Sequence, residues 1–380
     1  MKINKKSWYL GICLLAMSTL IACTDMQEAN DQKNQPQTNV NAIPVETTSN
    51  QLSNDFYRAM IVDGEYETSS NRGVSLDLNS AINMKDFESG LLEVSRNVFA
   101  TDKYYFQEGQ MISENQARKW LGRKSEENPE GLNPAGNGSD DPSSRVPNYL
   151  SQILEQDFMI QTDKGFELGG IAIGLAMNQI DYYTTKDEQS RIYTYQQELD
   201  LETVEKYAQQ YGNEIVARLR AENEIESIPI VVGIFIQSPQ DSLAGGVYTY
   251  DGLSTSGNSV SEWVPRKEKK VLFPVDENSE DASHFANFKN EIQSFFPNLS
   301  GVNGVGHYRD EQLQNLKIDI MTQFYGETEI IAFTQHVTDA ASRYLPESTR
   351  VEIKIESIGG IESFVARESQ SQTFTYHIFD

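Results

Sequence analysis

The chain has 380 residues, of which 56 are acidic and 31 are lysine or arginine, so its formal net charge is -25. A surface this acidic repels nucleic acid and anionic lipid headgroups, which argues against direct binding to a polyanion. With 38% hydrophobic residues, the chain is long enough to bury the cores of two or more domains.

The first 22 residues have the pattern of a lipoprotein signal peptide. Three lysines precede an apolar run from Trp8 to Ala22, which is shorter than the roughly 20 apolar residues that a stable membrane span needs. The run closes with Leu20-Ile21-Ala22-Cys23, the pattern of a bacterial lipobox. We expect cleavage between Ala22 and Cys23 and a diacylglyceryl group on the Cys23 thiol. The alternative is an ordinary secretory signal that happens to contain a cysteine.

This modification predicts both the maturation partners and the location of the protein. A prolipoprotein diacylglyceryl transferase and a lipoprotein signal peptidase would process the chain. Two acyl chains supply the two signals that stable membrane anchoring requires. The mature protein would then be anchored by lipid at the extracellular face of the cell membrane. Because Cys13 is removed and Cys23 carries lipid, no disulfide is possible, and stability must come from a packed core.

Residues 23–51 are rich in Asn, Gln, Thr and Asp and predict a flexible polar linker. From Leu52 onward, hydrophobic periodicity predicts a folded region. It indicates strands at 55–66, 104–106, 169–177, 191–195, 228–236, 313–324, 351–355 and 374–378, and helices at 84–98, 113–121, 149–158, 200–219, 285–295 and 330–344. The proline- and glycine-rich segment 122–147 predicts a long irregular loop, either functional or simply mobile. The glycine-rich segment 301–306 predicts a turn.

The order helix, strand, long helix, strand occurs around 149–236 and again around 285–357. We interpret it as a degenerate duplication of an α/β unit, with chance as the alternative. The expected fold class is α+β or α/β, with mixed sheets backed by helices. We place a first domain at 52–276 and a second at 277–380, with the boundary in the acidic segment that begins at Asp276.

No motif in the sequence specifies catalysis. The four histidines, His284, His307, His336 and His377, lack the spacing of metal ligands, and no nucleophile elbow or phosphate-binding loop is present. We therefore expect no metal, no cofactor and no enzymatic activity. The alternative is a membrane-tethered cell-envelope enzyme whose site forms only in three dimensions.

Aromatic residues give a weak indication of binding. Tyr182, Tyr183, Tyr193 and Tyr195 flank one expected hairpin turn, and Trp263 lies in a separate segment beside Arg266 and Lys267. Exposed aromatics recur at peptide and sugar sites, although core packing explains tyrosines on strands equally well. If these aromatic residues form a binding site, the extracellular region is a binding module for an unknown ligand.

Several motifs resemble the CamS family, the sex-pheromone precursor lipoproteins of low-GC Gram-positive bacteria. They are the lipobox, Asn71-Arg72-Gly73, Phe87–Leu92, Phe99–Gln110, Gly131–Pro134 and Gly170–Tyr183. The resemblance covers most of the chain and implies no catalytic residue. It implies that the freed signal peptide is trimmed to a short hydrophobic pheromone, here Ala16, Met17, Ser18, Thr19, Leu20, Ile21 and Ala22. Ser18 and Thr19 depart from the continuously apolar pheromone of the family. The alternative is a signal tail that is discarded without acting as a message.

Overall fold

The computed structural model describes residues 44–72, 74, 78–223, 225–276, 279–295, 301–324 and 326–379. The expected signal peptide, the Ala22–Cys23 cleavage site and the pheromone segment 16–22 all lie outside these residues. No helix among the described residues is both long and apolar enough to cross a membrane.

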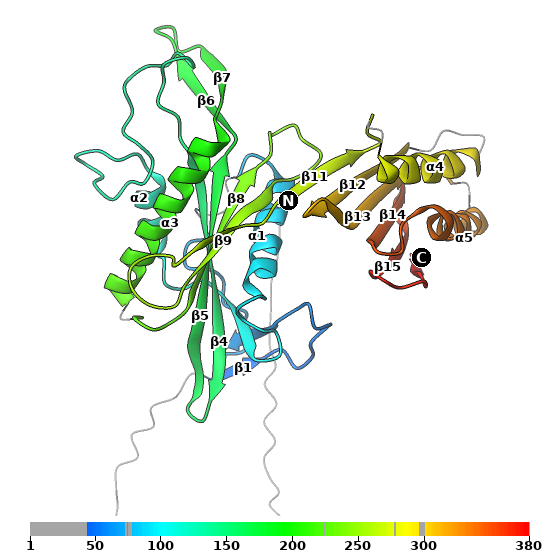
Figure 1. Cartoon of the computed structure of the whole chain (residues 1–380), viewed down its shortest axis with the longest axis horizontal. Helices are drawn as coiled ribbons and strands as arrows, with labels where there is room; N and C mark the ends of the chain where they lie inside the picture. Colours follow the sequence, from blue (N-terminus) through cyan, green and yellow to red (C-terminus); the bar gives the residue numbers. More distant parts are fainter. Residues whose placement is uncertain are drawn as a thin grey trace, which may run out of the picture. The chain divides into compact units, whose positions relative to one another are not determined.

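The first part of the chain forms an eight-stranded mixed sheet (Figure 1), in the order β1-β2-β3-β4-β5-β8-β9-β10. Its strands are β1 (Val45–Thr47), β2 (Arg58–Val62), β3 (Tyr104–Glu108), β4 (Leu150–Thr162), β5 (Gly165–Asn178), β8 (Ile230–Gln237), β9 (Val247–Ser254) and β10 (Trp263–Pro265). Helix α1 (Ala81–Ser95) packs on one face in a core with Phe158 and Phe235. Helices α2 (Glu114–Leu121) and α3 (Leu201–Asn223) pack in a second core with Ile173 and Ile234. Because both faces are covered, β8 is buried along its whole length and β4 and β5 are buried over most of theirs.

Small residues on β5 let aromatic rings approach the backbone closely. A Cβ atom at Gly170 would lie 2.1 Å from a ring atom of Phe99, and one at Gly174 would lie 2.8 Å from the ring of Phe87. The alternation of large and small residues in 169–177 predicts a strand with one bulky face and a close neighbour on the other face. The structure confirms this arrangement.

The later part of the chain forms a six-stranded sheet in the order β11-β12-β13-β14-β15-β16. Its strands are β11 (Glu268–Phe273), β12 (Gly301–Arg309), β13 (Gln312–Met321), β14 (Arg350–Ser357), β15 (Gly360–Arg367) and β16 (Thr375–Ile378). Helices α4 (Glu280–Phe295) and α5 (Glu327–Tyr344) share one core with it, centred on Phe288, Phe333 and Ile353. A separate hairpin, β6 (Ile180–Lys186) and β7 (Ile192–Glu198), forms a two-stranded sheet of its own. The expected class, mixed sheets backed by helices, is confirmed.

The two sheets repeat one topology. The order β3-α2-β4-β5-α3-β8-β9-β10 has the same connections as β11-α4-β12-β13-α5-β14-β15-β16. In each set the third and fourth strands are parallel and joined through a helix, and all other neighbours are antiparallel. The hairpin β6–β7 is inserted between β5 and α3 of the first set. A repeat is therefore present, but it begins at β3 and β11 and not at the positions expected from the sequence.

Two expected elements are wrong. In the segment 149–158, expected to be a helix, residues 150–158 belong to strand β4. Leu150, Ile153 and Leu154 have helical spacing, but a strand buried on both faces carries apolar residues without a period of two, so periodicity cannot separate the two structures. Residues 301–306 belong to strand β12 and not to a turn, because Gly304 and Gly306 face the rings of Phe285 and Phe273.

The expected boundaries also shift. Strand β1 lies inside the segment 23–51 that was expected to be a linker, and it pairs with β2, so the fold starts before Leu52. The change of sheet falls between Pro265 of β10 and Glu268 of β11, ahead of the expected boundary at 276. The strand expected over 55–66 is shorter, and Phe56 is exposed. The remaining expected helices and strands are confirmed, with small shifts at their ends.

Candidate functional site

Three of the four tyrosines predicted from the sequence share one face of the hairpin β6–β7. Tyr183 lies opposite Tyr195 in the antiparallel register, and Thr185 lies opposite Tyr193. Because side chains alternate along a strand, Tyr183, Tyr193 and Tyr195 point to one side and Tyr182 to the other. The rings of Tyr183 and Tyr195 stack with centroids 5.4 Å apart and planes 22° apart. We call these three residues the tyrosine face.

A buried ion pair fixes the base of this hairpin. The Arg145 guanidinium contacts the Asp181 carboxylate, whose side chain is only 4% exposed, and the Asn148 amide donates to the same carboxylate at 2.9 Å. The guanidinium also lies 3.9 Å from the centroid of the Tyr183 ring. The Arg145 guanidinium therefore contacts both a carboxylate and an aromatic ring. Because these contacts already restrict the tyrosine face, less conformational entropy is lost when a ligand binds to it.

The long loop between α2 and β4 is fastened along the hairpin (Figure 1). The Tyr183 hydroxyl donates to the Asp140 carbonyl at 2.7 Å, and the Gln197 amide donates to the Arg145 carbonyl at 3.2 Å. Nearer its start, the Arg123 guanidinium donates to the carbonyls of Pro134 and Val146. These bonds fasten segment 122–147 to the hairpin and to itself.

The outer end of the hairpin is open to solvent. Ile192, Tyr193 and Tyr195 are 64%, 41% and 36% exposed, respectively. Tyr182 has a supporting position instead, since its hydroxyl accepts a hydrogen bond from the Gln240 amide at 3.3 Å. An exposed aromatic group on a hairpin held at its base has the character of a contact surface.

Trp263 does not join the tyrosines. It lies on β10 and packs against α3, where a Cβ atom at Gly212 would be 2.8 Å from its ring. The ring is partly buried against the core that α3 shares with the large sheet. Trp263 therefore lies apart from the hairpin, as the sequence placed it, and core packing explains its position.

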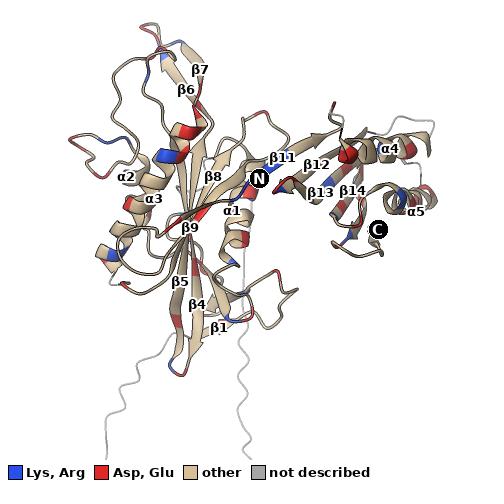
Figure 2. Cartoon of the chain, in the orientation of Figure 1, with Lys and Arg blue, Asp and Glu red and all other residues tan. Residues whose placement is uncertain are grey.

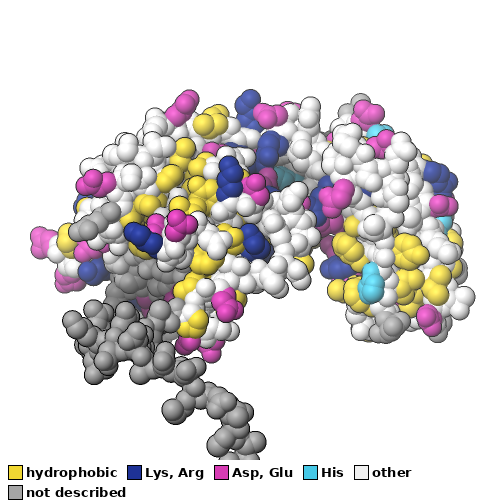
Figure 3. Space-filling view, turned by 90° about the horizontal axis from the view of Figure 1, so that it is seen from below, with side chains coloured by type: hydrophobic (Ala, Val, Ile, Leu, Met, Phe, Trp, Pro, Cys, Tyr) yellow, Lys and Arg dark blue, Asp and Glu magenta, His cyan; other side chains and the backbone are white. Residues whose placement is uncertain are grey.

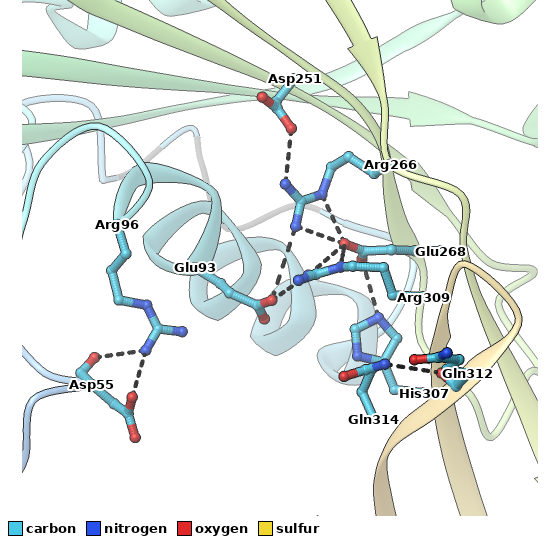
Figure 4. A network of polar contacts seen from close by, with 10 residues as sticks. All are labelled: Asp55, Glu93, Arg96, Asp251, Arg266, Glu268, His307, Arg309, Gln312 and Gln314. Atoms are coloured by element: carbon cyan, nitrogen blue, oxygen red, sulfur yellow. Dashed lines mark hydrogen bonds and ion pairs between the residues drawn. The ribbon is translucent and has the colours of Figure 1, made fainter. Parts of the chain in front are cut away.

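A charged network around Glu268 was not predicted from the sequence (Figure 4). The guanidinium groups of Arg266 and Arg309 both donate to Oε1 of Glu268 at 2.8 Å, and His307 Nε2 lies 3.1 Å from Oε2. Burial alone would raise the pKa of Glu268, but the hydrogen bond with His307 and the charges of Arg266 and Arg309 lower it to about 2.

This network joins the two sheets. Glu93 of α1 contacts Arg309 of β12, and Asp251 of β9 pairs with Arg266 at 2.8 Å (Figure 4). Nearby, Lys270 of β11 pairs with Asp86 of α1 at 2.5 Å. Figure 2 shows basic residues on β11 in a predominantly acidic chain. The charges compensate one another, so this cluster is structural.

Two carboxyl groups on β4 are sealed from solvent. Glu155 is 0% exposed and Asp157 is 1% exposed. Glu155 accepts hydrogen bonds from the amides of Met111 and Ile112 at 2.7 and 2.8 Å, and Asp157 accepts one from the Gln110 amide at 2.9 Å. A substrate cannot reach this pair, so it holds the loop between β3 and α2 in place. Within the described part of the chain, no three His, Cys, Asp or Glu side chains are grouped as metal ligands.

Exposed hydrophobic side chains also gather on the second sheet (Figure 3). Ile361 of β15 is 48% exposed, Tyr376 of edge strand β16 is 69% exposed, and Phe379 directly after it is 44% exposed. The His377 ring packs edge-on against Phe379 with centroids 4.7 Å apart. Sequence reasoning did not single out this region.

Comparison with protein families matches residues 66–373 to the family described as CamS sex pheromone cAM373 precursor. The chain belongs to the CamS family. This family name denotes a pheromone precursor rather than an enzyme, and it implies a secreted or surface protein. A comparison with curated proteins gives no match.

Two solved CamS structures resemble this chain closely. A sex pheromone precursor from Lactobacillus salivarius subsp. salivarius UCC118 is 40% identical, with a TM-score of 0.83, and the match covers 89% of this chain and 99% of that one. The C-terminal domain of the sex pheromone staph-cAM373 precursor from Staphylococcus aureus is 30% identical, with a TM-score of 0.68, and the match covers 80% of this chain and 98% of that one. The resemblance stated from sequence motifs is confirmed.

Proposed function

We propose that this CamS protein is made as a lipoprotein whose signal-peptide tail is released as a peptide pheromone. The sequence Leu20-Ile21-Ala22-Cys23, placed directly after a short apolar run, carries the proposal. Cleavage before Cys23 leaves a diacylglyceryl anchor in the outer leaflet of the cell membrane, and two acyl chains are enough for stable attachment. Membership of a family of pheromone precursors supports the same processing.

Substitution of the anchoring cysteine tests the lipid modification. In cells grown with labelled palmitate, we expect the wild-type protein to carry label and Cys23→Ala to carry none, because only the thiol accepts diacylglycerol. The unlabelled variant should remain uncleaved or appear in the medium. Cys13→Ala is the matched control, since that thiol leaves with the signal peptide. Label on Cys23→Ala, or an unmodified amino terminus on mature wild-type protein, would contradict the lipid anchor.

The synthetic peptide Ala16–Ala22 tests the pheromone separately. The segment is uncharged and largely apolar, so it can leave the membrane and diffuse. We expect it to induce a mating response in responsive donor cells at nanomolar to micromolar concentration, and a scrambled peptide of the same composition to induce none. Equal responses, or no response to either peptide, would contradict the pheromone activity and would not affect the proposed lipid anchor.

For the extracellular region we propose a binding role rather than catalysis, with the tyrosine face of the hairpin as the contact surface. Its support is geometric. Tyr183, Tyr193 and Tyr195 lie on one side of the hairpin, and Arg145 holds its base. The acidic pair Glu155 and Asp157 is inaccessible, which weakens the alternative of a cell-envelope enzyme.

A further inference from the structure

A second candidate site lies on the large sheet, at the edge where α1 meets β3 and β4. A cavity of about 210 Å³ opens there, lined mainly by polar residues. Its polar lining includes Tyr66, Arg72, Glu88 and Glu108, and Leu154 of β4 is the apolar part of the lining. Neither the hairpin nor the charged network around Glu268 contributes to this cavity.

Hydrogen bonds hold one wall of the cavity in place. The segment 66–72 is fastened to β3 and the loop after it through several bonds. The Tyr66 hydroxyl donates to Glu108 at 2.9 Å, the Gln107 amide donates to Glu67 at 2.7 Å, and the Ser70 amide donates to the Gly109 carbonyl at 2.9 Å. A wall fixed in this way loses little conformational freedom when a ligand binds.

The lining places two carboxylates near one guanidinium. Partial burial and then the charge of Glu108 raise the pKa of Glu88, and the charge of Arg72 opposes this shift. A cationic group between Glu88 and Glu108 would relieve the repulsion between them. Arg72 brings a planar set of donors that suits a carboxylate. A guanidinium in the lining argues against a divalent cation, and two carboxylates argue against a simple anion.

Gln156 of β4 is a buried neighbour of two lining residues, Glu88 and Glu108. Gln156, which is 3% exposed, lies opposite Glu108 in the strand register and donates to the Glu88 carbonyl at 3.2 Å. Among the described residues, its Oε1 atom has no hydrogen-bond partner, and neither has Nδ2 of the fully buried Asn71 beside Arg72. The bond from Gln156 holds the backbone of Glu88 on α1 against β4, so the position of this lining residue is fixed as well.

We propose that this cavity binds a small zwitterion, a free α-amino acid in its simplest form. The ammonium group lies between Glu88 and Glu108, and the carboxylate contacts Arg72. Leu154 provides the apolar contact for a short side chain. This site depends on neither the lipid anchor nor the pheromone.

Binding of amino acids to the full-length protein in detergent tests the proposal. The proteinogenic L-amino acids are screened individually by thermal shift at millimolar concentration, and hits are measured by calorimetry. We expect at least one to raise the unfolding midpoint, whereas its decarboxylated and deaminated analogues do not. For L-alanine these analogues are ethylamine and propanoate. Calcium chloride is expected to give no shift at this site.

Variants locate the binding. Glu88→Gln and Arg72→Gln are each expected to weaken binding about tenfold or more, since each removes a charge-assisted contact. Glu114→Gln, on the exposed face of α2, is the matched control and should bind as the wild type does. The absence of a shift with every amino acid would overturn the proposal, as would binding that survives both pocket variants. Binding lost only in the double variant Tyr193→Ala, Tyr195→Ala would move the site to the tyrosine face.

Discussion

Replacing Glu268 with glutamine is expected to lower the free energy of unfolding by about 3 kcal/mol at neutral pH. The pKa of Glu268 falls from 4.5 to about 2 in the folded protein, and each unit corresponds to about 1.4 kcal/mol. The side chains of Glu268 and Arg266 are 6% and 7% exposed, so solvent screens this interaction little. The loss is large because Arg266 and Arg309 share the carboxylate and remain partly buried without it.

The effect has a defined dependence on pH. Because the folded pKa is lowered, the stabilisation by Glu268 is complete above about pH 4.5 and is lost as the pH falls through about 2. Urea unfolding of the wild type and of Glu268→Gln at several pH values should therefore give curves that converge in acid. Glu311→Gln is the control, since Glu311 is 81% exposed and pairs with Lys269 at the surface. A constant difference between the curves at every pH would contradict the assigned pKa.

The elements predicted correctly from the sequence are those with one buried face and a recognisable capping residue. For α3, the Asp200 carboxylate accepts a hydrogen bond from the Thr203 amide, and Val204, Ala208 and Ile215 are buried on one side. Strand β4 was mistaken for a helix because its apolar residues lie on both faces. Strand β12 was mistaken for a turn because its glycines make room for aromatic rings, a reason that only the packed core reveals.

The same limit applies to the candidate sites. Tyr183 and Tyr195 could be predicted as neighbours because the expected hairpin itself brings them together. Arg145 and Asp181 are 36 residues apart in the chain, and Glu93 and Arg309 are 216 apart. No local pattern relates such partners, because only the pairing of distant elements brings their charges into contact. The cavity beside α1 depends in the same way on α1, β3 and β4 meeting.

The carboxyl pair on β4 responds to pH in the opposite direction from Glu268. Burial, and after it the charge of Glu155, raises the pKa of Asp157 well above its ordinary value of 3.8. Its Oδ1 atom accepts no hydrogen bond from any described residue, so no donor stabilises a negative charge on that oxygen. Glu155 uses both oxygens to accept backbone hydrogen bonds and therefore has the position of the charged partner.

We therefore expect opposite results from two conservative substitutions. Asp157→Asn resembles the protonated acid and should leave stability at neutral pH unchanged or raised. Glu155→Gln turns an amide NH₂ toward the amide of Met111 or Ile112, which should lower the free energy of unfolding by about 1–3 kcal/mol. Denaturant unfolding at neutral pH measures both effects. Asp163→Asn, at the exposed turn between β4 and β5, is the control for a change of charge alone.

The pH dependence separates the two carboxyl groups further. A raised folded pKa means that the contribution of Asp157 is complete below its ordinary pKa of 3.8 and is lost as the pH rises through the folded pKa. The wild type should lose stability over that rise, relative to Asp157→Asn, because ionising Asp157 places two negative charges side by side in the core. If both variants are destabilised equally and the wild type shows no such decline, the proton does not reside on Asp157. The loop between β3 and α2 would then be held by two ionised carboxylates.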